Sequence, residues 1–242
     1  MRARLGAYGA WQLRDFVFER AVAIMMVGLL LVFGTYESLG PGGRTMIAAG
    51  GHDATLFGAR AAAEHLGLMW FIVALIAVHG ISANDRTTGR FRLIFAKPVR
   101  VARYYAQAFA LHGVAFMLCV LVWLATLSRV MPIGRETASN ALAILACSYV
   151  LVGGVCFLMS ALFRFDWVGT VGVFGAAMYL ASKFPKASWL GPLPPFWRIS
   201  EQVDNLKTLD PLDAKILLWV VAYGVACFLL GLIILERRPL AT

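Results

Sequence analysis

Long, continuously apolar segments constrain this chain more than any other feature. The last of them, ILLWVVAYGVACFLLGLIIL at 216–235, contains no charged side chain. A helix needs about 20 predominantly apolar residues to cross a hydrocarbon layer of about 30 Å. Because the runs are continuous rather than alternating, they favour membrane helices over the strands of a barrel. We predict an all-α integral membrane protein with six transmembrane helices, at 16–36, 62–83, 104–128, 139–163, 165–183 and 215–235.

The composition agrees with lipid as the solvent for most of the chain. Of the 242 residues, 60% are hydrophobic and 14% are charged, whereas soluble domains carry about 25% charged residues. The net charge of +9 suits loops that face the anionic cytoplasmic leaflet, so we expect no nucleic-acid partner. The four cysteines lie inside apolar runs and form no C-x-x-C pair, which indicates small buried side chains rather than a metal site.

The distribution of basic residues predicts the orientation in the membrane. Thirteen of the 22 Lys and Arg residues lie in the N-terminal segment, the loop 84–103, the fourth-to-fifth connection and the C-terminal tail. Since basic residues concentrate in cytoplasmic loops, we expect a multi-pass protein of the cytoplasmic (inner) membrane with both termini inside. Asp15, Glu19 and Arg20 precede the first run, and no cleavage site follows it. We therefore expect an uncleaved first span and one membrane domain over 1–242.

The N-terminal segment before the first span mixes basic and aromatic residues. Arg2, Arg4 and Arg14 surround Tyr8 and Trp11, which is typical of an interfacial helix lying among lipid headgroups. The apolar periodicity is imperfect, so a frayed basic tail is the alternative interpretation.

The outer segment 184–214 holds five of the nine prolines. After Pro195, apolar residues recur at helical spacing, which predicts a short amphipathic helix that rests on the outer membrane face or caps the spans. Asp210 followed by Pro211 predicts the start of the last helix, with Asp210 as its N-cap. The apolar positions of the short helix are Phe196, Ile199, Val203, Leu206 and Leu209.

The loop 84–103, NDRTTGRFRLIFAKPVRVAR, is the most basic part of the chain, yet it contains an apolar cluster over 91–95. Gly89 and Pro98 bracket this cluster, so a helix of about two turns fits between them. A cationic helix with an apolar face suits docking onto a cytoplasmic partner. The alternative is a positively charged inner loop whose aromatic side chains dip into the membrane interface.

The loop also resembles the corresponding loop of the ABC-2 type transporter permease family, the transmembrane subunits of type-2 ABC exporters. The departures from that pattern are Asp85 where glutamate is usual, Arg90 where a small polar residue is common, and Phe95 after the aliphatic pair. The interfacial N-terminal helix, the six spans and the proline-rich outer segment are similar as well. The matching residues are Asp85, Gly89, Leu93-Ile94, Pro98-Val99, Arg100 and Arg103.

The resemblance implies a permease that pairs with a second permease copy or a paralogue and with separate ABC ATPase subunits. The loop 84–103 would then be the coupling loop, seated on the ATPase. The chain has no G-x-x-x-x-G-K-[ST], and its glycine-rich stretch at 40–45 lacks the lysine. We therefore expect no enzymatic activity and no cofactor in this chain itself, with ATP bound by the partner. The coupling residues would be Asp85, Gly89, Phe91, Leu93, Ile94, Pro98, Arg100 and Arg103.

Polar residues within the apolar spans are further candidates for function. Glu64 and His65, near the outer end of the second span, line a translocation path or else are interface residues reached by water. Asp166 beside Arg164 suggests a short-loop ion pair at the inner surface. Glycines within the spans are expected to allow close helix packing; these are Gly153, Gly154, Gly169, Gly172 and Gly175.

Two other functions are compatible with parts of this pattern. His79 and His112 fall at similar depth in neighbouring spans, so a membrane cytochrome that binds haem through them is one alternative. Electron transfer, however, has no need of a basic amphipathic connector. The other alternative is a non-transporting membrane scaffold that recruits a soluble partner through the loop 84–103.

Overall fold

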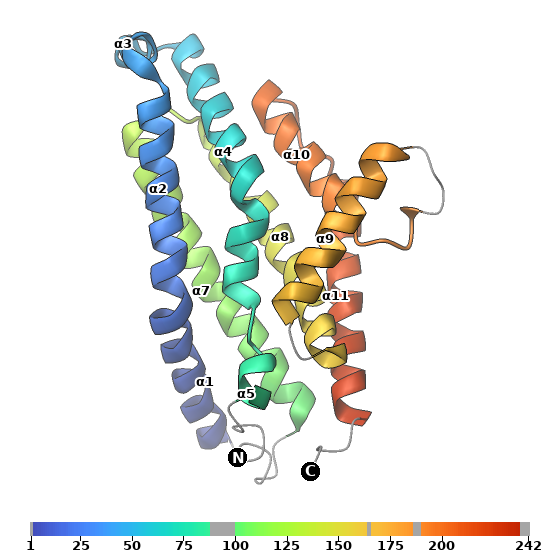
Figure 1. Ribbon diagram of the computed structural model, residues 1–242. Coiled ribbons are helices and arrows are strands. Elements are labelled where there is room, and N and C mark those ends of the chain that lie inside the picture. Colours follow the sequence, from blue (N-terminus) through green and yellow to red (C-terminus); the bar gives the residue numbers. More distant parts are fainter. Residues whose placement is uncertain (1, 88–99, 164–165, 186–189, 238–242) are drawn as a thin grey trace.

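The structure, a computed structural model, describes residues 2–87, 100–163, 166–185 and 190–237, and every regular element within these ranges is helical. The predicted all-helical class is therefore confirmed. A π-helical turn, η1 (Val17–Ala21), separates the first two helices. The α-helices are α1 (Arg2–Phe16), α2 (Val22–Ser38), α3 (Gly40–Ala49), α4 (His52–Val78), α5 (Ala83–Thr87), α7 (Val101–Val130), α8 (Arg135–Leu162), α9 (Asp166–Lys183), α10 (Phe196–Thr208) and α11 (Ala214–Arg237) (Figure 1).

Helices in the described ranges are long and apolar enough to cross a membrane, which agrees with a multi-pass membrane protein. Four segments meet this description by length and composition: Tyr8–Glu37, Val101–Val130, Arg135–Leu162 and Ala214–Arg237. A fifth is counted if His52–Gly67 and Met69–Asp85, which meet at an angle of 52°, form one broken span. The predicted span at 165–183 is present as the helix α9, but its 18 residues reach only about 27 Å, and it is not among these segments.

The first span is longer than the predicted 16–36. The helix does not begin at residue 16. It begins with α1 and continues through η1 into α2 without a gap. A π-turn adds one residue to a helical turn and shifts the phase of the side chains that follow. The N-terminal segment is therefore helical, as predicted, and α1 packs on α7, where the rings of Tyr8 and Tyr104 lie 6.1 Å apart.

Helix α8 is the centre of the bundle, and it contacts α4, α7, α9, α10 and α11. Its closest neighbour is α11, because glycines face each other across the interface. A Cβ atom on Gly154 would overlap the carbonyl oxygen of Gly224, and one on Gly224 would lie 2.5 Å from the carbonyl oxygen of Val150. The backbones of these two helices are thus in direct contact, the arrangement for which small residues are favoured in membrane bundles.

The predicted packing role of the other glycines is confirmed only in part. A Cβ on Gly153 would lie 2.6 Å from the ring of Phe109, and one on Gly169 would lie 3.3 Å from the sulfur of Met159. Added Cβ atoms on Gly172 and Gly175 would meet no atom within 4 Å. These two residues of α9 therefore make no close helix contact within the described chain.

The short helix predicted after Pro195 is present as α10, and Phe196, Ile199, Val203 and Leu206 are all buried. Three expectations need correction. Leu209 does not belong to the apolar face, because it is exposed and ends the helix in the left-handed conformation with φ +58°. The helix contacts the sides of α4, α8, α9 and α11 rather than resting over their ends.

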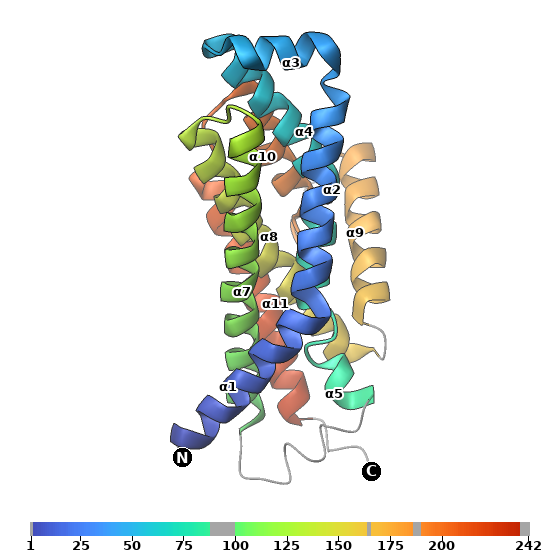
Figure 2. The same cartoon turned by 90° about the vertical axis from the view of Figure 1, so that its left-hand side faces the viewer.

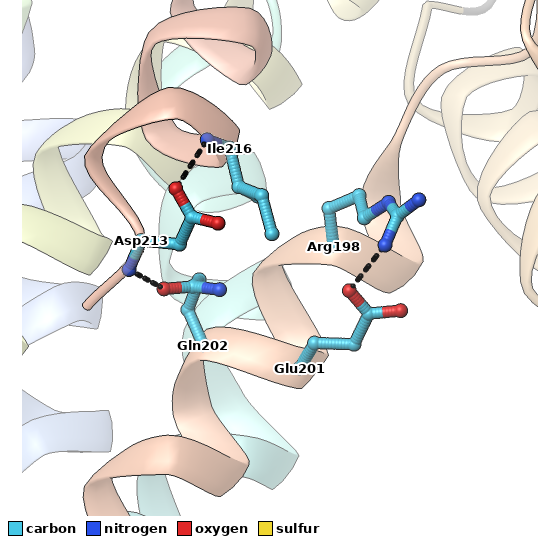
Figure 3. Close-up of polar contacts among 5 residues, drawn as sticks. All are labelled: Arg198, Glu201, Gln202, Asp213 and Ile216. Carbon is cyan, nitrogen blue, oxygen red and sulfur yellow. Dashed lines mark hydrogen bonds and ion pairs between the residues drawn. The ribbon is translucent and has the colours of Figure 1, made fainter. Parts of the chain in front are cut away.

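The third correction concerns the start of α11. The carboxylate oxygen Oδ1 of Asp213 accepts hydrogen bonds from the amides of Lys215, at 2.8 Å, and Ile216, at 3.3 Å (Figure 3). Asp213 therefore caps the helix, in place of the predicted Asp210. The side chain of Asp210 instead pairs with the hydroxyl of Thr208.

The helix ends on either side of the loop 84–103 lie at the same end of the bundle as the first and last described helix ends (Figure 1). The start of α1, the helix α5, the start of α7 and the end of α11 all lie at one end (Figure 1). Helix α3 lies across the opposite end, between α2 and α4 (Figure 2). The chain therefore enters and leaves the bundle at the end where α5 leads into the loop 84–103.

Candidate functional site

The candidate site is a break in the helix that leads to the basic loop. Helix α4 ends at Val78, and residues 79–82 form a turn before α5 begins. Gly80 has φ +74°, a left-handed conformation that glycine adopts readily, and a Cβ there would lie 2.8 Å from the side chain of Asn84. A break of this kind leaves backbone carbonyl and amide groups without helical partners. Two buried side chains from other helices supply those partners.

Arg20, from η1, is the first of these side chains. Its Nη2 donates to the carbonyl oxygen of His79 at 2.9 Å, and its Nη1 lies 2.8 Å from Nδ1 and 3.2 Å from Nε2 of His112. A guanidinium group only donates hydrogen bonds, so the ring of His112 must accept and is therefore neutral. A cation at the C-terminal end of α4 is also favoured by the helix dipole. Arg20 thus joins the first span to α4 and α7.

Asp166 is the second of these side chains, and it is buried at the start of α9. Its Oδ2 accepts from the amide of Gly80 at 2.7 Å, and its Oδ1 accepts from the amide of Trp167 at 2.7 Å. Interpreting Asp166 as half of a short-loop ion pair missed this role; Arg164 lies outside the described residues. We call Arg20, His79, Gly80, His112 and Asp166 the hinge cluster.

A polar cavity of about 30 Å³ adjoins the hinge cluster. A space of this size holds about two water molecules. Gln12 lines it with both side-chain amide atoms buried, and neither atom has a hydrogen-bond partner among the described residues. Asp85 and Tyr104 line the same cavity, together with Asp15 and Glu19.

The predicted coupling residues differ in exposure, and several of them lie outside the described residues. Asp85 is only 6% exposed, and it is one of the residues that line the cavity. Arg100 and Arg103 are exposed where α7 begins. The remaining predicted coupling residues lie outside the described residues, as does the predicted helix between the bracketing glycine and proline; they are Gly89, Phe91, Leu93, Ile94 and Pro98.

Glu64 and His65 are not part of the hinge cluster. They lie on α4 more than three helical turns before the break. Glu64 is exposed, and the half-buried His65 has Nδ1 2.8 Å from the carbonyl oxygen of Ala61. Both therefore lie in the half of the bundle opposite the basic loop.

The two histidines considered as haem ligands contribute different groups to the hinge cluster. The ring of His112 contacts Arg20, whereas His79 contributes its backbone carbonyl, and its ring Nδ1 lies 3.0 Å from the carbonyl oxygen of Ile76. Among the described residues, no group of three or more His, Cys, Asp or Glu side chains is arranged to hold a metal ion.

Sequence reasoning did not find the hinge cluster, although one signal for it was present. Arg20 is a charge next to an apolar run, and such charges are often functional. Its partners, however, lie 59 and 92 positions further along the chain. No local pattern connects them, because the contact depends on how three helices pack.

Replacing Asp166 tests whether the turn depends on its cap. We expect Asp166→Ala to lower the free energy of unfolding by about 1–3 kcal/mol, because the buried amide of Gly80 loses its acceptor. Asp166→Asn keeps an oxygen acceptor and should lose less than half as much. Thermal unfolding in detergent measures the stabilities, and hydrogen exchange reports on the Gly80 amide. Unchanged exchange at Gly80 in Asp166→Ala would contradict the assignment.

Comparison with models of protein families gives no match for this chain, and comparison with curated proteins gives none.

Proposed function

We propose that this chain is the transmembrane permease subunit of a type-2 ABC exporter, and that a separate ATPase drives it through alternating access. The proposal counts six spans, including the broken helix α4–α5 and the short α9, with both termini in the cytoplasm. The main support for this proposal is the position of the basic loop. The basic loop with the family-like residues Asp85, Gly89 and Pro98 follows directly on a helix break that two buried charged side chains hold in place.

The arrangement of helix ends supports this proposal. The start of α1, the end of α11 and both ends of the loop lie at the same end of the bundle (Figure 1). Arg100, Arg103 and Arg237 are exposed there. An end rich in basic residues belongs on the cytoplasmic side, where an ATPase would reach the loop.

The hinge cluster suggests how a push on the loop would reach the spans. ATP binding would draw the ATPase subunits together and displace the loop and α5. The turn before α5 is bonded to the first span by Arg20 and to α9 by Asp166. Displacement of α5 therefore acts on three helices at once and shifts the population between inward-open and outward-open states.

Reconstitution with the ATP-binding subunit that is encoded nearest in the genome tests the proposal. The purified pair in lipid vesicles should hydrolyse ATP about fivefold faster or more than the ATPase alone, and it should move a compound across the membrane only with ATP. A stable complex that neither stimulates hydrolysis nor moves any compound would favour the scaffold alternative.

Substitutions in the loop test its coupling role. Gly89→Ala and Pro98→Ala should uncouple ATP hydrolysis from export while the protein still inserts into the membrane, because they alter the backbone that bounds the docking segment. Gly42→Ala and Pro41→Ala are matched controls, since both residues are exposed in α3 at the opposite end of the bundle. The coupling role would be refuted if both loop variants kept normal ATPase stimulation and normal export.

A further inference from the structure

One face of α10 is charged although the helix lies between membrane spans. Arg198 and Glu201 form an ion pair of 2.9 Å, and their side chains are 45% and 46% exposed. Gln202 follows Arg198 by one turn of α10 and faces the first turn of α11, beside this ion pair (Figure 3). One turn further on, Lys207 and Asp204 form a second pair at 2.7 Å. Helix α10 therefore carries two positive and two negative charges, in two ion pairs.

The first turn of α10 lies at the depth of the spans. The ring of Phe196 contacts the rings of Trp70 and Phe174, with centroids 6.4 Å and 5.3 Å apart. Trp70 and Phe174 are interior residues of α4 and α9. Just before α10, the carbonyl oxygen of Pro192 accepts a hydrogen bond of 2.8 Å from the hydroxyl of Tyr223, which is inside the α11 span.

The depth of Arg198 can be compared with that of a lipid-facing residue. Gln202 Oε1 accepts from the amide of Asp213 at 2.8 Å, so these two residues are level. Arg198 precedes Gln202 by four residues, about 6 Å along α10, and Leu218 follows Asp213 by five residues, about 7.5 Å along α11. The two side chains therefore lie at similar depths, and Leu218 is 70% exposed, as suits a lipid contact.

A charged pair at this depth needs water or protein around it. Charged side chains that face hydrocarbon are costly, and those found in spans border protein or a water-filled cavity. An ion pair with nearly half of each side chain exposed is not shielded by this chain. Lipid hydrocarbon is therefore a costly medium for this face of α10.

We infer that the Arg198–Glu201 face of α10 borders a water-filled recess in the outer half of the bilayer. Glu64 is exposed on α4 one turn from Arg60, whose Nε donates to the carbonyl oxygen of Lys207 at 3.3 Å. As the face is charge-balanced, it suits a polar substrate without selecting the sign of its charge. That the recess is part of the substrate path rests on the proposed function; that it holds water does not.

Cysteine labelling tests the recess directly. The full chain, with its four native cysteines replaced by alanine, is placed in lipid vesicles with a charged, membrane-impermeant maleimide on both sides. Only a hydrated thiol ionises and reacts readily. Arg198→Cys should therefore react about tenfold faster or more than Leu218→Cys. Its rate should be near that of Thr208→Cys, the control at the last residue of α10, which is exposed.

The outcomes separate the recess from the transport function. Labelling of both Arg198→Cys and Glu201→Cys as slow as that of Leu218→Cys would overturn the recess; the second variant covers a folding defect in the first. Fast labelling without any ATP-driven transport would leave the recess standing and refute the proposed function. If export occurs, modification at position 198 should slow it. Export at an unchanged rate would show that the recess is not the path.

Discussion

Gly224→Ala is expected to disrupt the packing of α8 against α11 and to leave little folded protein. The added methyl group would lie 2.5 Å from the carbonyl oxygen of Val150 and 2.8 Å from the Cα of Leu151. Both atoms belong to the backbone of α8, so no side-chain rotation can relieve the overlap. The helices must separate, and the cost should be about 3 kcal/mol, the upper end for overpacked sites. Gly154→Ala should behave in the same way, because its methyl group would overlap Gly224.

Gly172→Ala is the matched control for this prediction. It makes the same chemical change within a helix, but its methyl group would meet no atom within 4 Å. Alanine has the higher helix propensity, so this variant should be as stable as the parent or slightly more so. The yield of monodisperse protein and the unfolding temperature in detergent measure the difference. Equal stabilities for the Gly224 and Gly172 variants would contradict the direct backbone contact.

Arg20→Met is expected to destabilise the turn between α4 and α5 and to uncouple the loop from the first span. The variant keeps an apolar stem but removes the donors to the His79 carbonyl and the His112 ring. Hydrogen bonds from a charged donor contribute about 1.5–3 kcal/mol each. Since burying the guanidinium group itself costs free energy, we expect a net loss of about 2 kcal/mol. The proposed coupling should suffer more than stability does, because this contact joins the turn to the first span.

Two further variants separate the geometry from the charge. Arg20→Lys keeps the cation but has a single nitrogen, which cannot repeat the planar two-nitrogen contact, so it should rescue only part of the stability. Arg14→Met removes an exposed arginine two turns earlier in the chain and should have no effect. The ratio of ATP hydrolysed to compound exported would report coupling. Normal coupling in Arg20→Met would rule out the relay through the hinge cluster.

Most helices could be predicted from the sequence, because an apolar run as long as the bilayer has few other conformations. The spans predicted at 104–128, 139–163 and 215–235 match α7, α8 and α11 to within a few residues. The helical spacing after Pro195 likewise located α10 correctly. Hydropathy reports which residues suit lipid, however, and not where a helix ends. The helix containing the predicted span 62–83 therefore begins ten residues earlier, at His52, and breaks before residue 83.

The candidate site was less accessible to sequence reasoning, because its contacts are made between helices that are distant in sequence. Asp85 was chosen through its place in the loop pattern, yet its side chain lines a cavity inside the bundle. Asp166 was assigned to its sequence neighbour, whereas its carboxylate bonds to the amide of Gly80, 86 positions away. Gly172 matched the packing pattern, but a Cβ on it would meet no atom of the described residues within 4 Å. Contacts of this kind depend on adjacency in space, which adjacency in sequence does not reveal.

The buried contacts of Arg20 also constrain the order in which the protein can be assembled. Chains are made from the N-terminus, so the first span leaves the ribosome before its partners exist. The His79 carbonyl follows 59 residues later and the His112 ring 92 residues later. Until then the guanidinium group must stay hydrated near the headgroups, as long basic side chains near helix ends do. The first span therefore reaches its final position only after the third long helix has been synthesised, and a fragment that ends before His112 should leave Arg20 in water.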